Sequence, residues 1–379
     1  MRIAFYAPMK PPDHPVPSGD RTMGRLIIAA LERAGHGVET ASRFRSWTSG
    51  DATRAARVAA LGARLADRWL RQSALQPARR PSLWFTYHLY YKAPDYLGPR
   101  IAAALDIPYV VAEASYAAKH GAMGANAAVA AALGRADAVI GLNRADRAGV
   151  LPLLATPERW VDLPPFVDTA PWRRARREHD GARRALAERH SLDVSSCWLL
   201  TVAMMRRGDK LRSYEILARA LARHAGRPWQ LLVAGTGAAH AEVTALFASL
   251  GGGRIAWLGE LTPPTLAPVL AAADLFVWPA VNEAYGLALL EAQAAGLAAV
   301  VGAAGGIPDI VADGATGRLV PPSDAAAFAA ALEPLIADRD LCRRWGDAAA
   351  ERMARLHDIG PAADRLDALL RRLVEGHRR

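Results

Sequence analysis

Cysteine and lysine are scarce in this chain, and both shortages limit what the protein can be. Among 379 residues there are two cysteines, Cys197 and Cys342, and neither belongs to a C-x-x-C pair. They allow at most one disulfide bond, and no zinc-binding spacing is present, so we expect a protein of a reducing compartment. The four lysines are Lys10, Lys92, Lys119 and Lys210. Nearly all basic side chains are therefore arginines.

Long apolar runs are also missing. The longest uncharged run, residues 292–308, is interrupted by Gly, Gln and Pro. The start, MRIAFYAP, has the pattern of a strand and no basic, apolar and small-residue signal peptide. We therefore expect a cytoplasmic protein that is neither secreted nor membrane-spanning.

Positive charge is concentrated in the first half of the chain. The net charge is +10, and Lys plus Arg outnumber Asp plus Glu by 21 to 14 in residues 1–168, whereas residues 196–379 hold 19 of each. This excess of positive charge has two alternative explanations, GC-rich codon usage and a functional basic surface. No module of interleaved aromatic and basic residues accompanies it, so we expect no nucleic-acid partner.

Residues 51–80 give the basic surface a specific form. They contain five arginines at spacings of three, seven, four and three, which lie along one side of a helix with Ala, Val and Leu between them. Such a helix either rests on an anionic membrane surface or is simply solvated. These arginines are Arg54, Arg57, Arg64, Arg68 and Arg71.

Strand-like and helix-like segments alternate twice along the chain. Short apolar runs such as SLWFTYH and WQLLVAGTG are each followed by a helical pattern, which is typical of parallel sheets covered on both faces. A Pro-led, charged segment separates the two series, and the length fits two domains. We predict an α/β protein with two doubly wound, Rossmann-like domains facing a central cleft, where ligands bind at the carboxyl ends of strands. The predicted parts are an N-terminal domain (1–168), a linker (169–195), a second domain (196–360) and a C-terminal helix (361–379) that is a candidate to pack back on the first domain.

Two glutamates stand out in NEAYGLALLEAQAAG, residues 282–296. Glu283 is predicted in the loop before a helix and Glu291 about a turn and a half inside it. Gly286 allows a ligand to approach the free N–H groups at the helix N-terminus, which suits an anion, while carboxylates accept hydrogen bonds from hydroxyl groups. The stretch therefore suits a ligand with diphosphate and polyol parts. In the alternative interpretation, Glu283 caps the helix and Glu291 is solvated.

The region ADLFVWPAVNEAYGLALLEAQAAGLAAVVGAAGGIPD resembles the C-terminal signature of family 4 (group 1) retaining glycosyltransferases of the GT-B fold, whose E-x7-E motif Glu283 and Glu291 match. The resemblance implies that Glu283 contacts the transferred sugar and Glu291 the nucleotide ribose. It also implies that the Gly286 and Leu287 amides meet the diphosphate, with Tyr285 beside them. The resemblance extends over most of the chain, through PSGDRTMGR, ADAVIGLNRADR and LPPFVD. It implies that residues 1–168 form the acceptor-side domain and residues 196–360 the nucleotide-sugar-binding domain.

Cations are expected where a departing diphosphate gathers negative charge. In TVAMMRRGDKLRSY, Arg206 and Lys210 lie where the family has its Arg and Lys clamp, although Arg206 and Arg207 both lie closer to Lys210 than is usual. Asp209 is a candidate to orient one of the arginines. An ordinary solvated loop remains the alternative.

Two glycine-bearing loops complete the predicted donor side. Gly19 precedes a helix in PSGDRTMGR and by resemblance faces the diphosphate, while Arg21 or Asp20 faces the acceptor. A simple loop and helix cap is the alternative. Gly235, in AGTG after a strand, is expected to line the nucleotide pocket.

The acceptor side departs from the family pattern. Many members carry a histidine after the strand that corresponds to IPYVVAEAS, where this chain has Glu113 and Ser115. His88, at the end of the preceding strand, is a candidate for the cleft or a structural histidine among aromatic residues. The leaving phosphate can accept the acceptor proton in the mechanism proposed for this family, so a protein base is not required.

The resulting prediction is a retaining hexosyltransferase (EC 2.4) that acts in polysaccharide biosynthesis. It transfers sugar from a nucleotide diphosphate sugar to a glycan or lipid-linked acceptor without a metal or other cofactor, in the cytoplasm and peripherally at the inner face of the membrane if the basic helix binds there. The alternative is a catalytically silent sugar-nucleotide-binding subunit, because the expected histidine is missing. A nicotinamide oxidoreductase is disfavoured because no G-x-G-x-x-G follows the first strand.

Overall fold

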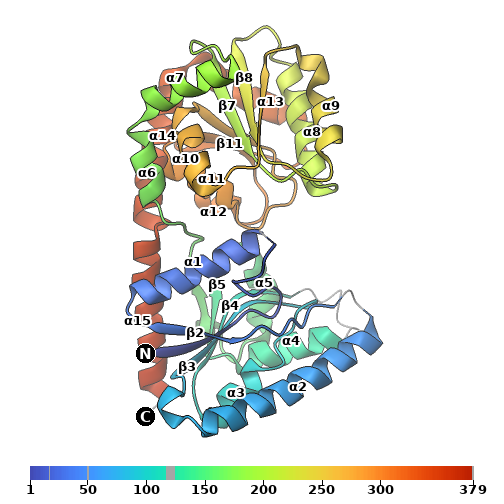
Figure 1. The fold of residues 1–379 in the computed structure, drawn as a ribbon, viewed down its shortest axis with the longest axis vertical. Coiled ribbons are helices and arrows are strands. Elements are labelled where there is room, and N and C mark those ends of the chain that lie inside the picture. The colour runs from blue at the N-terminus through green and yellow to red at the C-terminus, as the bar shows by residue number, and fades with distance from the viewer. Residues whose placement is uncertain (17, 49–50, 117–123, 378–379) are drawn as a thin grey trace. The chain divides into compact units, whose positions relative to one another are not determined.

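The computed structural model describes residues 1–16, 18–48, 51–116 and 124–377. The chain forms two compact units, one of Met1–Pro164 with Ile359–Arg379 and the other of Pro165–Asp358 (Figure 1). Each unit contains one six-stranded sheet, and all strand pairs among the described residues are parallel. The predicted α/β class with two Rossmann-like sheets is confirmed.

The sheet of the first unit has the strand order β2-β1-β3-β4-β5-β6. Its central strands are almost continuously apolar and buried, as expected for a sheet covered on both faces. The strands are β1 (Arg2–Tyr6), β2 (Gly37–Ser42), β3 (Leu83–Tyr90), β4 (Tyr109–Ser115), β5 (Ala138–Gly141) and β6 (Trp160–Asp162).

Helices cover both faces of this sheet (Figure 1). Helix α1 packs against α15, and α2 packs against α3 and α4. Helix α2 is the predicted basic helix, and its five arginines are all exposed while Gly62 and Ala66 are buried. The helices are α1 (Gly19–Arg33), α2 (Ala52–Ala74), α3 (Gly98–Leu105), α4 (Gly124–Arg135), α5 (Arg147–Val150) and α15 (Ile359–His377).

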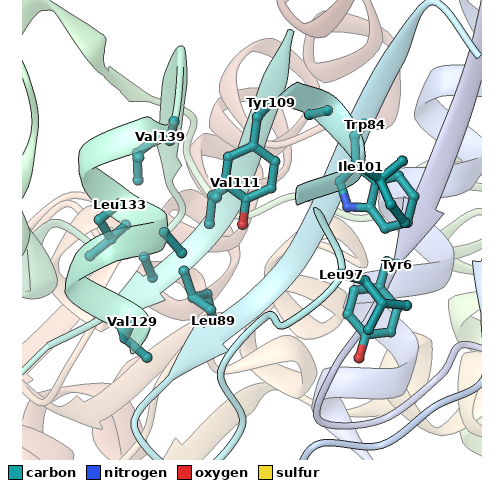
Figure 2. Close-up of a cluster of buried hydrophobic side chains, with 14 of the residues drawn as sticks. Tyr6, Trp84, Leu89, Leu97, Ile101, Tyr109, Val111, Val129, Leu133 and Val139 are labelled. Carbon is teal, nitrogen blue, oxygen red and sulfur yellow. The ribbon is translucent and has the colours of Figure 1, made fainter. Parts of the chain in front are cut away.

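Large aromatic and aliphatic side chains fill the core under this sheet. Figure 2 shows Tyr6, Trp84 and Tyr109 beside Leu97, Ile101 and the aliphatic residues of β4, α4 and β5. Asp95 is buried among them, where its carboxylate accepts hydrogen bonds from Thr86 Oγ1 (2.6 Å), Tyr109 Oη (3.1 Å) and the Leu97 and Gly98 amides (both 2.8 Å). The last two bonds satisfy free amides at the start of α3, so the polar group fixes the helix in an otherwise apolar core.

The second unit has the strand order β12-β11-β10-β7-β8-β9. Helices α8, α9 and α13 pack together on one face, and α6, α7, α10, α11 and α14 on the other (Figure 1). Its strands are β7 (Cys197–Val202), β8 (Trp229–Ala234), β9 (Ile255–Gly259), β10 (Leu275–Trp278), β11 (Ala298–Gly302) and β12 (Gly317–Val320). Its helices are α6 (Ala170–Arg176), α7 (His179–His190), α8 (Asp209–Ala222), α9 (His240–Phe247), α10 (Pro263–Ala272), α11 (Leu287–Ala294), α12 (Ile307–Ile310), α13 (Ala325–Ala337) and α14 (Arg339–Leu356).

The segment expected as a linker, 169–195, contains two helices. Both α6 and α7 belong to the second unit, which begins at Pro165. The Arg183 side chain is buried, forms an ion pair with Asp274 (Nη1 to Oδ2, 3.0 Å) and lies over the Trp198 ring at 4.1 Å. This charge-rich segment can therefore cover the core of the second unit, because the buried Arg183 is paired with Asp274.

The C-terminal helix α15 belongs to the first unit. It packs against α1, and Asp367 Oδ1 lies 3.1 Å from Nε2 of the buried His36, which follows α1. In the second unit Cys197 and Cys342 are buried free thiols. Within the described residues, none of the helices combines the length and the apolar character that crossing a membrane requires.

Candidate functional site

In the second unit, the direction of chain progression reverses between β7 and β10. The chain passes from β7 to β8 on one side of this point and from β10 to β11 on the other. The loops that follow these two neighbouring strands therefore diverge and leave a crevice at the carboxyl edge, where open α/β sheets bind ligands. Residues 203–208 and 279–286 form these two loops.

Lys210 and Glu283 meet at this switch point. Lys210 lies in the first turn of α8, after β7, and Glu283 lies in the loop after β10. Lys210 Nζ is 2.5 Å from Glu283 Oε2, and the two side chains are 24% and 21% exposed. The ammonium group also lies 5.2 Å from the centre of the Trp278 ring. The pair is held in a defined position and remains accessible to a ligand.

Two further hydrogen bonds attach the loop after β10 to α8. Val281 N donates to Ser213 Oγ (3.2 Å), and Asn282 Nδ2 donates to Asp209 Oδ2 (3.0 Å). Ser213 and Asn282 were not identified from the sequence, and Asp209, expected to orient an arginine, accepts this bond from Asn282. These contacts hold the two residues that precede Glu283.

Two glycines shape the same loop. Gly286 adopts φ +63° as the N-cap of α11, a left-handed conformation that a glycine takes without strain. Gly305 adopts φ +54°, and a Cβ placed on it would lie 1.9 Å from the Glu283 carbonyl oxygen. The loop thus packs directly on backbone, and the first amides of α11, including that of Leu287, lack partners within the helix.

Glu291 lies in α11 and is half-buried. This burial raises the pKa of its carboxyl to about 7. The alternative that Glu291 is simply solvated is therefore disfavoured. The companion alternative, that Glu283 caps the helix, is wrong, because the N-cap is Gly286 and no side chain caps α11.

The two neighbouring arginines differ in their contacts. Arg207 donates to Glu242 through Nε (3.0 Å) and Nη2 (2.7 Å). Arg206 is exposed, and within the described part of the chain it forms no ion pair. The guanidinium available to a ligand beside Lys210 is consequently that of Arg206.

The remaining predicted donor-side residues lie in both units. Tyr285 is 4% exposed, and its hydroxyl has no hydrogen-bond partner among the described residues. Gly235 follows β8, and a Cβ on it would lie 2.0 Å from the Ala203 carbonyl oxygen of the neighbouring loop. Gly19 begins α1 in the first unit, where Ser18 Oγ caps the helix by accepting from Arg21 N (3.2 Å).

At the carboxyl edge of the first unit, Asp20 and Glu113 lie on either side of His88. The switch point of this sheet lies between β1 and β3, so α1, which follows β1, and the end of β3 meet there. His88 Nδ1 is 3.3 Å from Asp20 Oδ1 and 3.9 Å from Glu113 Oε2. The structure therefore brings together the predicted acceptor-side residues His88 and Glu113. Arg21, in contrast, donates from Nη1 to the carbonyl oxygens of His14 (2.8 Å) and Pro15 (3.1 Å) and stabilises the loop.

The electrostatics of this group follow from burial and proximity. Burial raises the pKa of Glu113 to about 7, although the charge of His88 opposes the increase. Burial alone would lower the pKa of His88, but Glu113, Asp20 and Asp146 together raise it. Burial alone would raise the pKa of Asp20, but its contact with His88 lowers it. The carboxylates around His88 thus favour its positively charged form.

Asp146 was not identified from the sequence. It lies in the turn after β5, and burial raises its pKa, against the effects of Ser115 and His88. Its strand neighbours that of Glu113, and only this adjacency reveals that it belongs to the group. Among the described residues no group of three or more His, Cys, Asp or Glu side chains is arranged to hold a metal ion.

A cavity of about 810 Å³ lies at the amino edge of the second sheet, away from these loops. Asp274, at the start of β10, forms ion pairs there with Arg183 (Oδ2 to Nη1, 3.0 Å) and Arg339 (Oδ1 to Nη2, 3.1 Å) and accepts a hydrogen bond from the amide of Trp198. These charges neutralise one another and satisfy strand ends. We assign this network to stability rather than ligand binding.

Comparison with known structures defines the class of fold. The chain is similar to sucrose-phosphate synthase from Thermosynechococcus elongatus, with a TM-score of 0.75, 21% identity and 99% of each chain covered. It is similar to HepE of Anabaena in complex with UDP, with a TM-score of 0.75, 15% identity, and 98% of this chain and 100% of that chain covered. The fold is GT-B, an architecture of two Rossmann-like domains.

Sequence comparison addresses the second unit more closely. Residues 200–352 match the family model described as Glycosyl transferases group 1. A D-inositol 3-phosphate glycosyltransferase of Nocardia farcinica is 37% identical over 155 residues, which cover 38% of this chain and 34% of the relative. The match thus spans about a third of that relative's length. The matched model includes Lys210, Glu283 and Glu291.

Proposed function

We propose that this protein is a retaining glycosyltransferase that transfers a hexose-type unit from a nucleotide diphosphate sugar. The observation that carries the proposal is the contact between Lys210 and Glu283 at the switch point of the second sheet, with the half-buried Glu291 in the helix that follows. A cation, a carboxylate at the reaction centre and a second carboxylate for hydroxyl groups are the groups that such a donor requires. The family 4 assignment rests on their E-x7-E spacing.

In the proposed complex, the diphosphate lies at the N-terminus of α11. The Gly286 and Leu287 amides donate to it, and Lys210 and Arg206 neutralise the charge that develops as the bond to the sugar breaks. Lys210 releases Glu283 to do so, and Glu283 becomes available to the sugar. Catalysis then depends on position and electrostatics rather than on a metal, and we expect turnover to persist in a chelator.

The nucleoside is proposed to bind beside Glu291, Tyr285 and Gly235. Glu291 accepts hydrogen bonds from the ribose hydroxyls, and the Tyr285 hydroxyl gains a partner that it lacks among the described residues. Gly19 is proposed to approach the diphosphate from the first unit. These assignments extend the family resemblance to this chain residue by residue.

The first test is binding. Thermal unfolding of the full chain should be measured with UDP, GDP and ADP and then with the corresponding nucleotide sugars. A nucleotide present at a hundredfold excess over its Kd stabilises the protein by about 2.7 kcal/mol. No shift with any of the three nucleotides contradicts the proposal.

The two glutamates should then separate kinetically. Glu291→Gln should raise the KM for the donor because it removes a binding contact, whereas Glu283→Gln should lower kcat at saturating donor. Equal, near-wild-type kinetics for both variants would exclude the assigned site. Arg206→Ala should impair turnover, and Arg207→Ala, which only breaks the Glu242 pair, is the matched control.

The acceptor is proposed to be a glycan or a lipid-linked molecule bound on the first unit near His88 and Glu113. The named acceptor of the Nocardia relative, D-inositol 3-phosphate, is one compound to assay. For a lipid-linked acceptor we propose that the basic face of α2 holds the protein peripherally at the cytoplasmic face of an anionic membrane, each surface-near Arg contributing about 1 kcal/mol.

Vesicle sedimentation tests the proposed membrane contact. Binding to anionic vesicles at low salt should be lost when the five exposed arginines of α2 become glutamine. The control is an equal charge loss on α6 and α7, at Arg173, Arg174, Arg177, Arg184 and Arg189, all of which are exposed. No wild-type binding at low salt, or the same loss in both variants, contradicts a role specific to α2.

A further inference from the structure

Two neighbouring strands of the first unit are kinked at the same level. His88 of β3 has φ +62° and Glu113 of β4 has φ +58°, although neither is a glycine. The strands pair immediately before and after them, at Tyr87 with Ala112 and at Leu89 with Ala114. The kink therefore interrupts both strands at one point. Strained backbone of this kind persists only where the surroundings maintain it, and it concentrates at functional sites.

The kink brings unsatisfied polar atoms together. His88 Nδ1, Glu113 Oε2 and the Tyr87 hydroxyl are buried atoms that lie close to one another and to Asp20, with His88 Nδ1 3.3 Å from Asp20 Oδ1, but none of them forms a hydrogen bond of regular geometry within the part of the chain that the structure describes. Their side chains retain some access to solvent at His88 (16%) and Glu113 (11%). Buried polar atoms are normally satisfied, so these atoms are positioned for a ligand that supplies the missing bonds.

The charge around these atoms selects among ligands. The carboxylates of Asp20, Glu113 and Asp146 act on His88 together. Lys10 also acts on Asp20, whereas the Arg21 guanidinium is bonded to loop carbonyls. A phosphate at His88 would accept hydrogen bonds but would be repelled by the Asp20 carboxylate, and by Glu113 and Asp146 when they are ionised. A sugar hydroxyl donates to a carboxylate and accepts from an imidazole or phenol, so it satisfies both kinds of group.

Aromatic side chains continue from this group. The His88 and Tyr90 ring centres are 5.2 Å apart, and those of Tyr90 and Tyr91 are 5.5 Å apart. Trp47 adjoins Tyr90 and is 37% exposed. Rings with an apolar face and a polar edge suit a sugar, which also has an apolar face and a polar rim.

We infer that the acceptor is an uncharged, hydroxyl-rich sugar or polyol, and that Asp20, His88 and Glu113 determine this specificity by binding its hydroxyl groups and repelling phosphorylated acceptors. The inference rests on the proposed glycosyltransferase function and names its acceptor class. Of the two residues expected to face the acceptor, Arg21 and Asp20, it selects Asp20 as a specificity residue.

Matched acceptor pairs test the inference. With the nucleotide sugar selected by the binding screen, nucleoside diphosphate release should be measured with methyl glucoside against glucose 6-phosphate and with myo-inositol against myo-inositol 3-phosphate. We expect kcat/KM for the better neutral acceptor to exceed that of its phosphorylated partner at least tenfold. Equal or greater use of the phosphorylated partner overturns the inference.

The variants Asp20→Asn and Glu113→Gln, singly and combined, keep side-chain size while removing charge. In the double variant we expect the preference to fall to within about threefold, with the Kd for the nucleoside diphosphate unchanged. A uniform decrease for both members of a pair indicates a merely structural role and overturns the inference. His88→Gln should lower use of the neutral acceptor without raising use of the phosphorylated one.

Binding measurements separate this inference from the proposed function. Saturation-transfer NMR of the full chain with the two neutral and two phosphorylated probes reports acceptor binding without any donor. If no nucleotide binds but the neutral probe does, and Glu113→Gln abolishes that signal, the proposed function fails and the specificity site stands. If nucleotide binds but neither neutral probe binds even in its presence, the specificity inference fails alone.

Discussion

The carboxyl edges of the two sheets have the same architecture and different chemistry. In the second unit, the switch point carries Lys210, which contacts Glu283, and the exposed Arg206 in the loop after β7. In the first unit, the switch point carries Asp20 and His88, with Glu113 on the next strand. One edge therefore suits a diphosphate and the other an uncharged hydroxyl-rich ligand. The fold determines where the loops meet, and the residues in those loops determine what binds.

The backbone conformations at the two edges also differ. The loops after β10 and β11 of the second unit have glycines such as Gly286 and Gly305 at positive φ, although Ala280 is also there, at φ +49°. The first unit places His88 and Glu113, which have long side chains, in the same left-handed region. Glycine permits a ligand or a neighbouring loop to approach the backbone, whereas a side chain held in that conformation is aimed in an unusual direction at an energetic cost of about 1–3 kcal/mol. At the first edge this unusual conformation falls on the two ionisable side chains of the candidate site.

The largest effect that we expect comes from removing the cation of the second edge. Lys210→Ala should lower kcat about 10²- to 10³-fold, equivalent to about 2.7–4 kcal/mol, because the departing diphosphate loses a preorganised charge. Steady-state release of the nucleoside diphosphate measures this loss. Turnover within a few-fold of wild type would mean that a different residue neutralises the phosphate. The carboxyl edge of the second sheet would then not owe its diphosphate site to Lys210.

A control variant shows whether Lys210 acts through its charge. Lys210→Arg keeps the charge but changes its shape and position, so we expect it to recover part of the lost rate. Lys210→Met keeps much of the side chain's volume and should behave like Lys210→Ala. Equal activity of the Arg and Met variants would contradict an electrostatic role.

The second prediction concerns the glycine backbone of that edge. Gly305→Ala should destabilise the protein by more than about 1 kcal/mol, because the position has positive φ and the new Cβ would lie 1.9 Å from the Glu283 carbonyl oxygen. Gly314→Ala is the matched control, since Gly314 has φ +74° with no atom within 4 Å of the added Cβ. Chemical denaturation measures both variants. Equal losses would show that φ alone matters and that the loop can shift.

Much of the fold could be predicted from apolar patterns. The expected segments in the sheet centres, such as SLWFTYH for β3 and WQLLVAGTG for β8, form strands. The missed strands β2, β6 and β12 are all at sheet edges. An edge strand has one neighbour and is more exposed, so it needs no continuous apolar run; β2 has no buried residue. The linker prediction misjudged α6 and α7 because their charges concealed the buried Trp172 and Arg183.

The candidate site also has one part that could be predicted from the sequence and one part that could not. The spacing of Glu283 and Glu291 within one continuous segment was visible in the sequence, because a loop and the following helix form from local residues. The contact between Asp20, His88 and Glu113 depends on three separate segments meeting at one edge of a sheet, and the kink at His88 has no sequence signal comparable to a glycine. Only the tertiary structure reveals such a group.

The smallest predicted effect compares the two buried glutamates. Burial raises the pKa of both Glu291 and Glu113 from 4.5 to about 7. A carboxyl with a raised folded-state pKa favours folding fully below about pH 4.5, and this contribution is lost as the pH rises through about 7. Glu291→Gln removes the ionisable group, so we expect it to be more stable than wild type by about 1–2 kcal/mol at pH 8 and about equal to it at pH 4.5. Glu113→Gln gains a similar amount from the same pKa shift, but it also deprives His88 of a neighbouring carboxylate (Oε2 to Nδ1, 3.9 Å), so we expect a smaller net gain at pH 8. Chemical denaturation of the wild type and the two variants at both pH values measures the free energies of unfolding. A larger gain in stability for Glu113→Gln than for Glu291→Gln would contradict the stabilising role assigned to the contact between Glu113 and His88.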